Sequence, residues 1–204
     1  MTQSSDPTVV LLRSVRLSYP RLLVPRAFGG GDGDPKYSAS LLIPKTNKEA
    51  LAALGTAWKA AVERALPKFG GKVPPGLTKP WIDGDAKDEE TGDYIKSGEE
   101  CRGCWVLSAS SKTKPSVVTK TREPAVEEDV WAGEEAHVLV KLSGYVYGAK
   151  KGVTCYLNGV LLTGRGERID GRVNVSEAFA GLEEEFAAND DAFYDDALLG
   201  GIAA

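Results

Sequence analysis

The chain has 204 residues, 42% of them hydrophobic and 26% charged, which fits one globular domain with a tail or two very small domains. It offers no apolar run near the ~18 residues of a membrane span, no secretory signal, and three cysteines, an odd number that argues for a reducing cytosol. The net charge of −4 conceals an asymmetry along the chain. The residues after position 182 include seven acidic residues and no basic residue, whereas the preceding residues include 25 basic and 22 acidic ones. Such asymmetry is typical of a protein with a nucleic-acid or membrane partner and an interaction tail.

Two segments of alternating hydrophobicity open the chain, and both predict strands. Residues 8–20 form the first and residues 36–45 the second, with a glycine-rich loop at 26–35 between them. The residues expected to share one face of the first strand are Val9, Leu11, Val15 and Leu17. Those expected to share one face of the second are Tyr37, Ala39, Leu41 and Ile43.

The period of the apolar residues then changes to that of a helix, which we expect over residues 46–67. Thr46 and Glu49 have the spacing of a capping box, and Pro67 is expected to end the helix. Residues 67–100 are rich in Pro, Gly and Asp and predict a long irregular excursion.

Four further runs predict strands, at residues 104–111, 116–123, 135–148 and 152–164. Five to six short strands with one or two helices indicate a mainly β fold, either a small barrel or a sandwich with a helical insertion. The acidic composition after residue 182 favours disorder there.

The hairpin of residues 135–164 carries most of the functional signal. If Gly148 pairs with Val153 across a four-residue loop, Tyr145 faces Tyr156 and Val146 faces Cys155. This register gathers three tyrosines on the outer face, beside lysines on the strand and at the tip. The tyrosines are Tyr145, Tyr147 and Tyr156, and the lysines are Lys141, Lys150 and Lys151.

Exposed rings beside cations suit unpaired nucleic-acid bases, because rings stack on bases and cations hold phosphates. The alternative is that the tyrosine pairs only stabilise the sheet or are covered by the excursion. Further basic residues that are candidates for phosphate contacts are Lys112, Lys114, Lys120 and Arg122, and they also fit a charged strand edge. Trp81, in the excursion, is a further candidate for base stacking.

Metal sites find little support in the sequence, and we expect no cofactor. Cys101 and Cys104 have the spacing of half a zinc site, but strand parity separates Cys155 from the single histidine, His137. The acidic run at 83–93 departs from the calcium-loop pattern at Lys87 and Asp88. No nucleophile has a matching base, so we expect a protein that is not an enzyme.

Taken in order, "KYSASLLIPK", the helix, "SASSKTKPSVV" and "GYVYGAKKGVTCYLNGVLL" resemble the phage-encoded single-stranded-DNA-binding proteins related to that of phage T7. The likeness spans roughly residues 10–182. It implies an OB-fold-like, partly open five-stranded barrel over residues 1–182 and a flexible acidic tail over 183–204. It also implies binding of single-stranded DNA without sequence preference during phage DNA replication or recombination in the bacterial host cytoplasm.

In such proteins the acidic tail docks replication or recombination partners, such as a polymerase or helicase, and competes with DNA for the basic groove. The tail residues that match this role are Phe186, Asp190, Asp191, Phe193, Tyr194, Asp195 and Asp196. The resemblance leaves room for a homodimer. Two other functions stay open: a metal-dependent nucleic-acid hydrolase that uses the acids of 83–93, and an adaptor whose tyrosine face binds another protein.

Overall fold

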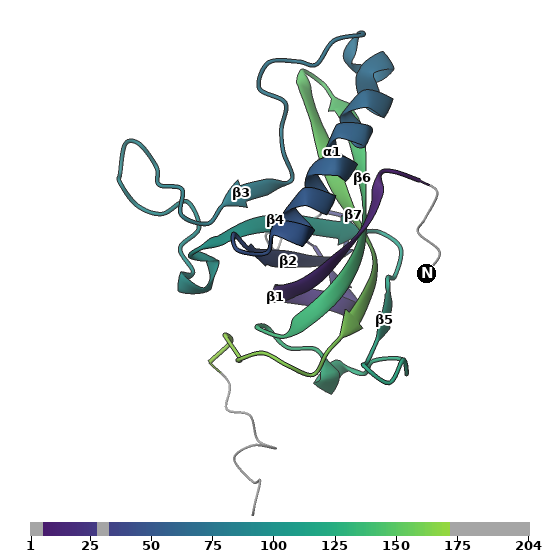
Figure 1. Cartoon of the computed structure of the whole chain (residues 1–204), viewed down its shortest axis with the longest axis vertical. Helices are drawn as coiled ribbons and strands as arrows, with labels where there is room; N and C mark the ends of the chain where they lie inside the picture. The colour runs from purple at the N-terminus through teal and green to yellow at the C-terminus, as the bar shows by residue number, and fades with distance from the viewer. Residues whose placement is uncertain (1–5, 28–32, 172–204) are drawn as a thin grey trace, which may run out of the picture. The chain divides into compact units, whose positions relative to one another are not determined.

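The computed structural model describes residues 6–27 and 33–171, and its strands form a single sheet (Figure 1). The strands are β1 (Val9–Arg26), β2 (Lys36–Pro44), β3 (Trp81–Asp83), β4 (Cys104–Ser111), β5 (Ser116–Val118), β6 (Glu135–Tyr147) and β7 (Lys150–Leu162). Their order is β3-β4-β2-β1-β6-β7-β5, and β4 also pairs with β7. This extra pairing closes β1, β2, β4, β6 and β7 into a five-stranded barrel, which confirms the OB-fold-like prediction.

Strand β1 is long because its first half pairs with β6 and its second half with β2. The register with β6 shifts between Leu12 and Val15, where Ser14 has a positive φ of 51°. Because such a bulge shifts the alternation by one residue, Leu12 is buried and Leu11 is 45% exposed. The prediction that Val9 and Leu11 share the face of Val15 and Leu17 is therefore wrong.

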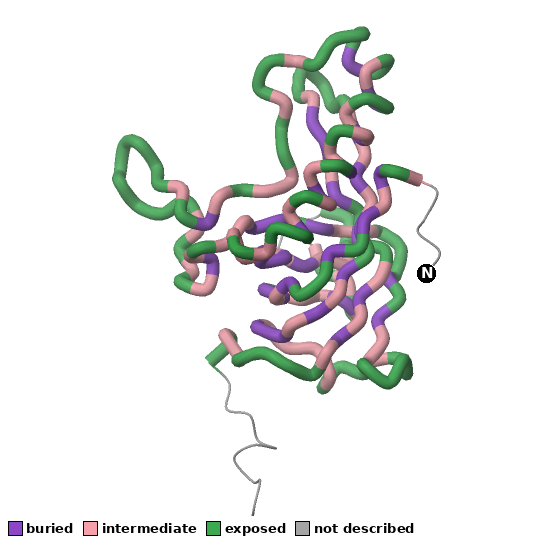
Figure 2. The backbone as a smooth tube through the Cα atoms, in the orientation of Figure 1, coloured by how far each residue is buried: buried purple, intermediate pink, exposed green. Residues whose placement is uncertain are grey.

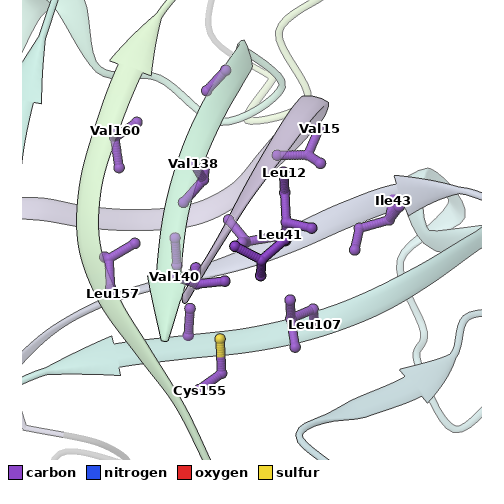
Figure 3. Close-up of a cluster of buried hydrophobic side chains, with 14 of the residues drawn as sticks. Leu12, Val15, Leu41, Ile43, Leu107, Val138, Val140, Cys155, Leu157 and Val160 are labelled. Carbon is purple, nitrogen blue, oxygen red and sulfur yellow. The ribbon is translucent and has the colours of Figure 1, made fainter. Parts of the chain in front are cut away.

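The core fills the barrel with aliphatic side chains from all five barrel strands (Figure 3). Alternation in β2 is as predicted, since Ala39, Leu41 and Ile43 are buried. Cys155 also lies in this core, and its burial raises the pKa of the thiol to about 12. It is therefore a small apolar packing residue of the barrel.

Helix α1 (Lys48–Phe69) covers β6, β1 and β7 through a face of small residues. Asn47 caps the helix by accepting a hydrogen bond from the Ala50 backbone N–H, so the predicted capping box at Thr46 is wrong. Pro67 lies inside the last turn and does not end the helix. The helix ends at Gly70, whose φ of 87° is the left-handed conformation common at C-terminal caps.

Glycine and alanine let α1 approach the β6–β7 hairpin closely. A Cβ atom added at Gly144 would lie 2.2 Å from the Ala65 Cβ atom. Lys151 donates a hydrogen bond from Nζ to the Phe69 carbonyl oxygen at 2.8 Å, at the end of the helix where a cation is favourable. The helix thus contacts and stabilises the half of the β6–β7 hairpin that lies near its turn.

The hairpin register differs from the prediction. Tyr145 pairs with Gly152 and Tyr147 with Lys150, so the loop consists of two residues, and Gly148 supplies the positive φ, 57°, that such tight turns require. From Val140 to the tip, each β6 residue therefore meets a partner four positions earlier in β7 than predicted. Because four is even, each of these residues keeps its predicted face, although Val146, expected in the core, is 45% exposed beyond the barrel. Beyond the register shift between Leu139 and Val140 the difference is three positions.

The remaining segments contain little regular structure. The predicted excursion holds β3 and the 3₁₀ turn η2 (Glu99–Cys101), and the predicted strand 116–123 is shortened to β5. A second 3₁₀ turn, η3 (Glu127–Asp129), follows β5. Among the described residues, no helix is long and apolar enough to cross a membrane.

The described core of the chain belongs to one compact unit that ends at Asp170. The acidic tail, 183–204, with all its candidate docking residues, lies outside the described residues, as does the predicted domain boundary at 182. The tail assignment and the two-domain division therefore stay predictions.

Glu134, just before β6, is a fully buried carboxylate. Its Oε1 atom accepts a hydrogen bond from the Gly164 N–H at 3.0 Å, whereas Oε2 has no hydrogen-bond partner among the described residues. Burial, with a smaller effect of the Asp129 charge, raises the pKa of Glu134 from 4.5 to about 7. The folded state therefore binds a proton here more tightly than the unfolded state does.

Because of this raised pKa, Glu134 should make the free energy of unfolding fall as pH rises from about 4.5 to about 7, by at most ~3 kcal/mol at 1.36 kcal/mol per pKa unit. We expect Glu134→Gln to flatten this fall, measured as urea midpoints at pH 5 and pH 8. Glu128→Gln, which removes an exposed carboxylate nearby, should keep the wild-type slope. An unchanged slope in Glu134→Gln would show that this carboxyl does not titrate there.

Candidate nucleic-acid interface

One row of directly paired residues crosses the outer face of the barrel where it closes. Arg21 of β1 pairs with Ser38 of β2, and Ser38 pairs with Ser110 of β4. Ser110 then pairs with Tyr156 of β7, which pairs with Lys141 of β6. We call these five residues the cross-strand row. Four interstrand steps give it a length of ~19 Å, with a cation at each end.

The row lies on the outside, because its neighbours along each strand point inward. Leu22, Ala39, Ala109, Cys155 and Leu142 are all buried in the core, and Tyr156 is 45% exposed. The alternation of buried and accessible residues along these strands is visible in Figure 2. Side chains of directly paired residues share a face, so the row is one continuous strip of surface.

The same sheet face is covered at one end. Leu42 and Val106, which pair across β2 and β4, pack against Cys101 and the partly buried Ile169. Towards the cross-strand row the outward residues of β2 and β4 become Ser40 and Ser108. The residue types thus change from apolar to hydroxyl to charged as the covering segments end.

A pocket of about 370 Å³ includes the Arg21 end of the row and concentrates positive charge. Its lining comprises Arg21, Arg26, Gly33, Asp34, Lys36, Ser38, Ser110 and Lys112. Lys112 pairs with Asp34, with Nζ 2.5 Å from Oδ2. This contact lowers the pKa of the Asp34 carboxyl and raises the pKa of the Lys112 ammonium. Four cations and one acid make the pocket a site for an anion.

Tyr19, two residues before Arg21 on β1, has an unusual backbone conformation. The β1–β2 register shifts between Ser18 and Arg21, and Tyr19 lies in this bulge with φ 47° and 72% of its surface exposed. A bulge changes the direction in which a side chain points, and a left-handed backbone conformation is strained for a residue with a large side chain. Tyr19 is therefore a candidate contact residue.

The hairpin tyrosines share the outer face with Tyr156, as predicted, but they are not its direct neighbours. Tyr145 lies about four residues, or ~14 Å, farther along β6 than the partner of Tyr156. Its ring lies on Gly152, where an added Cβ atom would come 2.7 Å from the hydroxyl oxygen. Tyr147 is 81% exposed at the tip, opposite Lys150.

The predicted cations separate into different places. Lys141 is in the row and Lys112 is in the pocket, whereas Lys151 is bound to the end of α1. Lys120 and Arg122 lie in the turn after β5, which pairs with β7 at Gly159 to Leu161, and neither lines the pocket.

Two other predicted DNA contacts also lie outside the pocket and the row. Lys114 is exposed in the β4–β5 connection and does not line the pocket. Trp81 is partly buried and packs edge-on against Trp58, with ring centroids 4.8 Å apart. The core packing of Trp81 makes it a weaker candidate for stacking.

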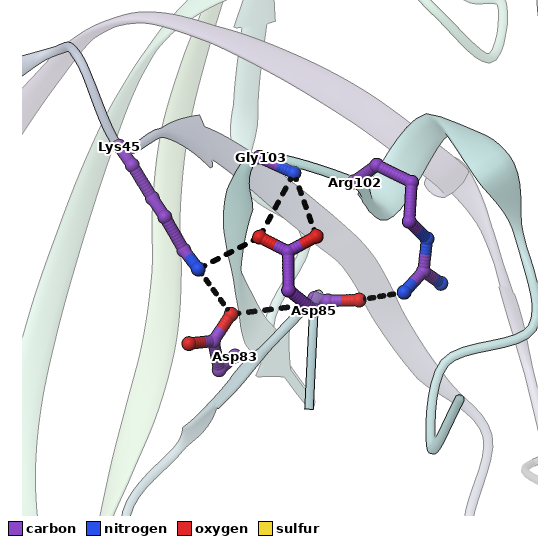
Figure 4. Close-up of polar contacts among 6 residues, drawn as sticks. Lys45, Asp83, Asp85, Arg102 and Gly103 are labelled. Atoms are coloured by element: carbon purple, nitrogen blue, oxygen red, sulfur yellow. Dashed lines mark hydrogen bonds and ion pairs between the residues drawn. The ribbon is translucent and has the colours of Figure 1, made fainter. Parts of the chain in front are cut away.

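The acidic run after β3 folds as a local structure fixed by basic residues (Figure 4). Lys45 Nζ lies 2.6 Å from Asp83 Oδ1 and 2.8 Å from Asp85 Oδ2, and the Gly103 N–H donates to Asp85. Arg102 donates to the backbone carbonyl of Gly84 in this run and to those of Lys96 and Gly98 after it. These carboxylates have partners in the fold, so the run has a structural explanation.

The cysteines do not converge with the histidine. Cys155 is inside the barrel, whereas His137 accepts a hydrogen bond from the Ser14 N–H through Nδ1 at 3.1 Å. Within residues 6–27 and 33–171, no group of three or more His, Cys, Asp or Glu side chains is arranged to hold a metal ion. The parity argument against a Cys₃His site agrees with these positions.

Sequence reasoning missed four residues of this surface: Tyr19, Arg21, Arg26 and Lys36. The outward position of Lys36 follows from the alternation of β2 and was within reach of the sequence. The positions of Tyr19 and Arg21 depend on the bulge, which leaves no periodic signal.

The sequence matches known phage proteins. The family model described as "Enterobacter phage Enc34, ssDNA-binding protein" matches residues 8–193. Putative protein p50 of Acyrthosiphon pisum secondary endosymbiont phage 1 is 27% identical over 169 residues, which are 79% of this chain and 86% of that protein.

Two solved structures of the single-stranded DNA-binding protein from bacteriophage Enc34 are similar to this fold. One, in complex with ssDNA, gives a TM-score of 0.67 at 24% identity and covers 82% of this chain and 96% of that one. The other gives a TM-score of 0.64 at 26% identity, with coverage of 87% and 97%.

The strain at Tyr19 is testable by comparing Tyr19→Gly with Tyr19→Ala. A left-handed φ disfavours any residue with a Cβ atom, so the glycine variant should be the more stable by ~1 kcal/mol, measured by urea unfolding. Val24, exposed on the same strand without a positive φ, is the matched control, and there alanine should be the more stable. If the alanine variant is the more stable at both positions, the backbone at Tyr19 is unstrained.

Proposed function

Because the chain belongs to the family of the Enterobacter phage Enc34 ssDNA-binding protein, we propose that it binds single-stranded DNA without sequence preference and catalyses no reaction. The observation that supports this most is the cross-strand row, with one exposed ring between cations. Tyr156 stacks on a base, while Arg21 and Lys141 contact phosphates on either side. The pocket cations, Lys112 among them, extend the phosphate track.

The surface chemistry favours single strands over duplex. A base must be unpaired to stack on Tyr156, and the serines of the row present hydroxyls that both donate and accept hydrogen bonds. Tyr19 at the bulge and Tyr145 and Tyr147 on the hairpin offer further rings on either side. A duplex keeps its bases stacked inside and offers this surface only its phosphates.

We assign the protein a role in phage DNA replication or recombination in the cytoplasm of the bacterial host. The acidic tail, 183–204, docks a polymerase, helicase or similar partner and competes with DNA for the basic surface. What supports the competition is charge: seven acids without a basic residue on a chain whose preceding part is positive.

The first test is fluorescence anisotropy with labelled oligo-dT and with a duplex of the same length, at several salt concentrations. We expect tighter binding of the single strand. The logarithmic salt slope should be about −3.5 if five phosphates are contacted, at ~0.7 per phosphate for single strands. Equal binding of the duplex, or no binding of either at low salt, would contradict the proposal.

If Tyr156 stacks on a base, its alanine and phenylalanine variants should differ in DNA affinity. Tyr156→Ala should weaken binding of oligo-dT, oligo-dC and oligo-dA alike, by a factor of about five to about 150, since a stacked base contributes ~1–3 kcal/mol. Tyr156→Phe retains the ring and should bind nearly as wild type. If both variants lose affinity equally, the hydroxyl group rather than the ring makes the contact.

A further inference from the structure

Two lysines of the proposed DNA surface, Lys112 and Lys141, are already in contact with a carboxylate of their own chain. Lys112 pairs with Asp34, which precedes β2, at 2.5 Å. Lys141 pairs with Asp6, which precedes β1, at 3.1 Å. Neither acid belongs to the barrel strands, so each reaches the sheet face from a flanking segment.

The two carboxylates differ in what else they hold. Asp6 also accepts hydrogen bonds from the Thr8 backbone and hydroxyl and pairs with Arg64 of α1, so it fastens the N-terminal segment to the helix. Asp34 lies in the pocket, on Lys112 and within the field of Lys36. Asp34 is the single acidic side chain among the described residues that line this pocket.

We propose that Asp34 is an intramolecular competitor of DNA: its carboxylate occupies the position on Lys112 that a backbone phosphate oxygen takes in the complex. The inference rests on the proposed function and assigns Asp34 the role of setting the affinity. A carboxylate and a phosphodiester each present two anionic oxygens, so one replaces the other on an ammonium group without a change in the kind of contact.

Fold stability does not require this ion pair. Both side chains are 69% exposed, and exposed pairs contribute little to folding because water and salt screen them. The same exposure lets DNA reach Lys112 once Asp34 moves aside. In the free protein Asp34 also offsets the mutual repulsion of Arg21, Arg26, Lys36 and Lys112 around the pocket.

The Asp34 ion pair therefore reduces the electrostatic free energy that phosphate binding gains at Lys112. A phosphate that binds there exchanges one ion pair for another, whereas a lysine without a partner acid gains a new ion pair. Removing the charge of Asp34 should therefore tighten DNA binding, most at low salt, where screening is weakest.

The test is Asp34→Asn, measured by anisotropy with labelled oligo-dT. We expect binding about three to ten times tighter than wild type at ~50 mM salt, with the gain shrinking at higher salt. Asp93→Asn, the same charge change at a residue that does not line the pocket, is the control and should alter binding less than about twofold. In the Lys112→Gln background, Asp34→Asn should give a smaller gain than in the wild type, because only its longer-range effect on the other pocket cations remains.

The outcomes separate this inference from the proposed function. If Lys112→Gln weakens binding but Asp34→Asn does not tighten it beyond the control, Asp34 is no competitor, while the DNA surface stands. If Asp34→Asn tightens binding equally with and without Lys112, the effect is one of net charge and the inference is wrong. If wild type binds no single-stranded DNA, both the function and the inference fail.

Discussion

The parallel contact between β4 and β7 is the interaction on which the candidate interface depends. It is formed at Ser110 and Tyr156, and it closes the barrel. Without it, Ser110 on β4 and Tyr156 on β7 would lie near opposite ends of the sheet order, separated by β2, β1 and β6. Closure thus makes one surface from residues on five strands, and the core of aliphatic side chains inside the barrel stabilises that closure.

Much of this arrangement follows from local pattern in the sequence. The helix and four of the five barrel strands were predicted to within two residues, because periods of 3.6 and 2 mark them directly. Strand β1 is the exception, since it extends six residues beyond its predicted end at residue 20. The outer face of the hairpin was also predicted correctly, although its register was wrong. A face depends on parity alone, whereas a register depends on the loop length, and "GAKKG" is compatible with both a four-residue and a two-residue loop.

The remainder depends on contacts that no local pattern records. The bulges at Ser14 and Tyr19 change which residues of β1 point outward, and a backbone bulge leaves no composition signal. Lys151 and Lys150 are adjacent and chemically identical, yet only Lys151 faces the carbonyl end of α1. Which of the two lysines reaches the helix depends on how α1 packs on the hairpin, and this packing is a tertiary property that the local sequence does not record.

The chemistry of the cross-strand row explains why one carboxylate can matter. A row with one stacking ring and two serines gains a limited, base-independent share of affinity from stacking, so most of the affinity of such a surface comes from phosphate contacts. Electrostatic affinity is sensitive to every charge within a Debye length, and Asp34 lies in direct contact with Lys112. If Asp34 competes with phosphate as proposed, it changes affinity more than stability, because its ion pair is exposed to solvent in the free protein.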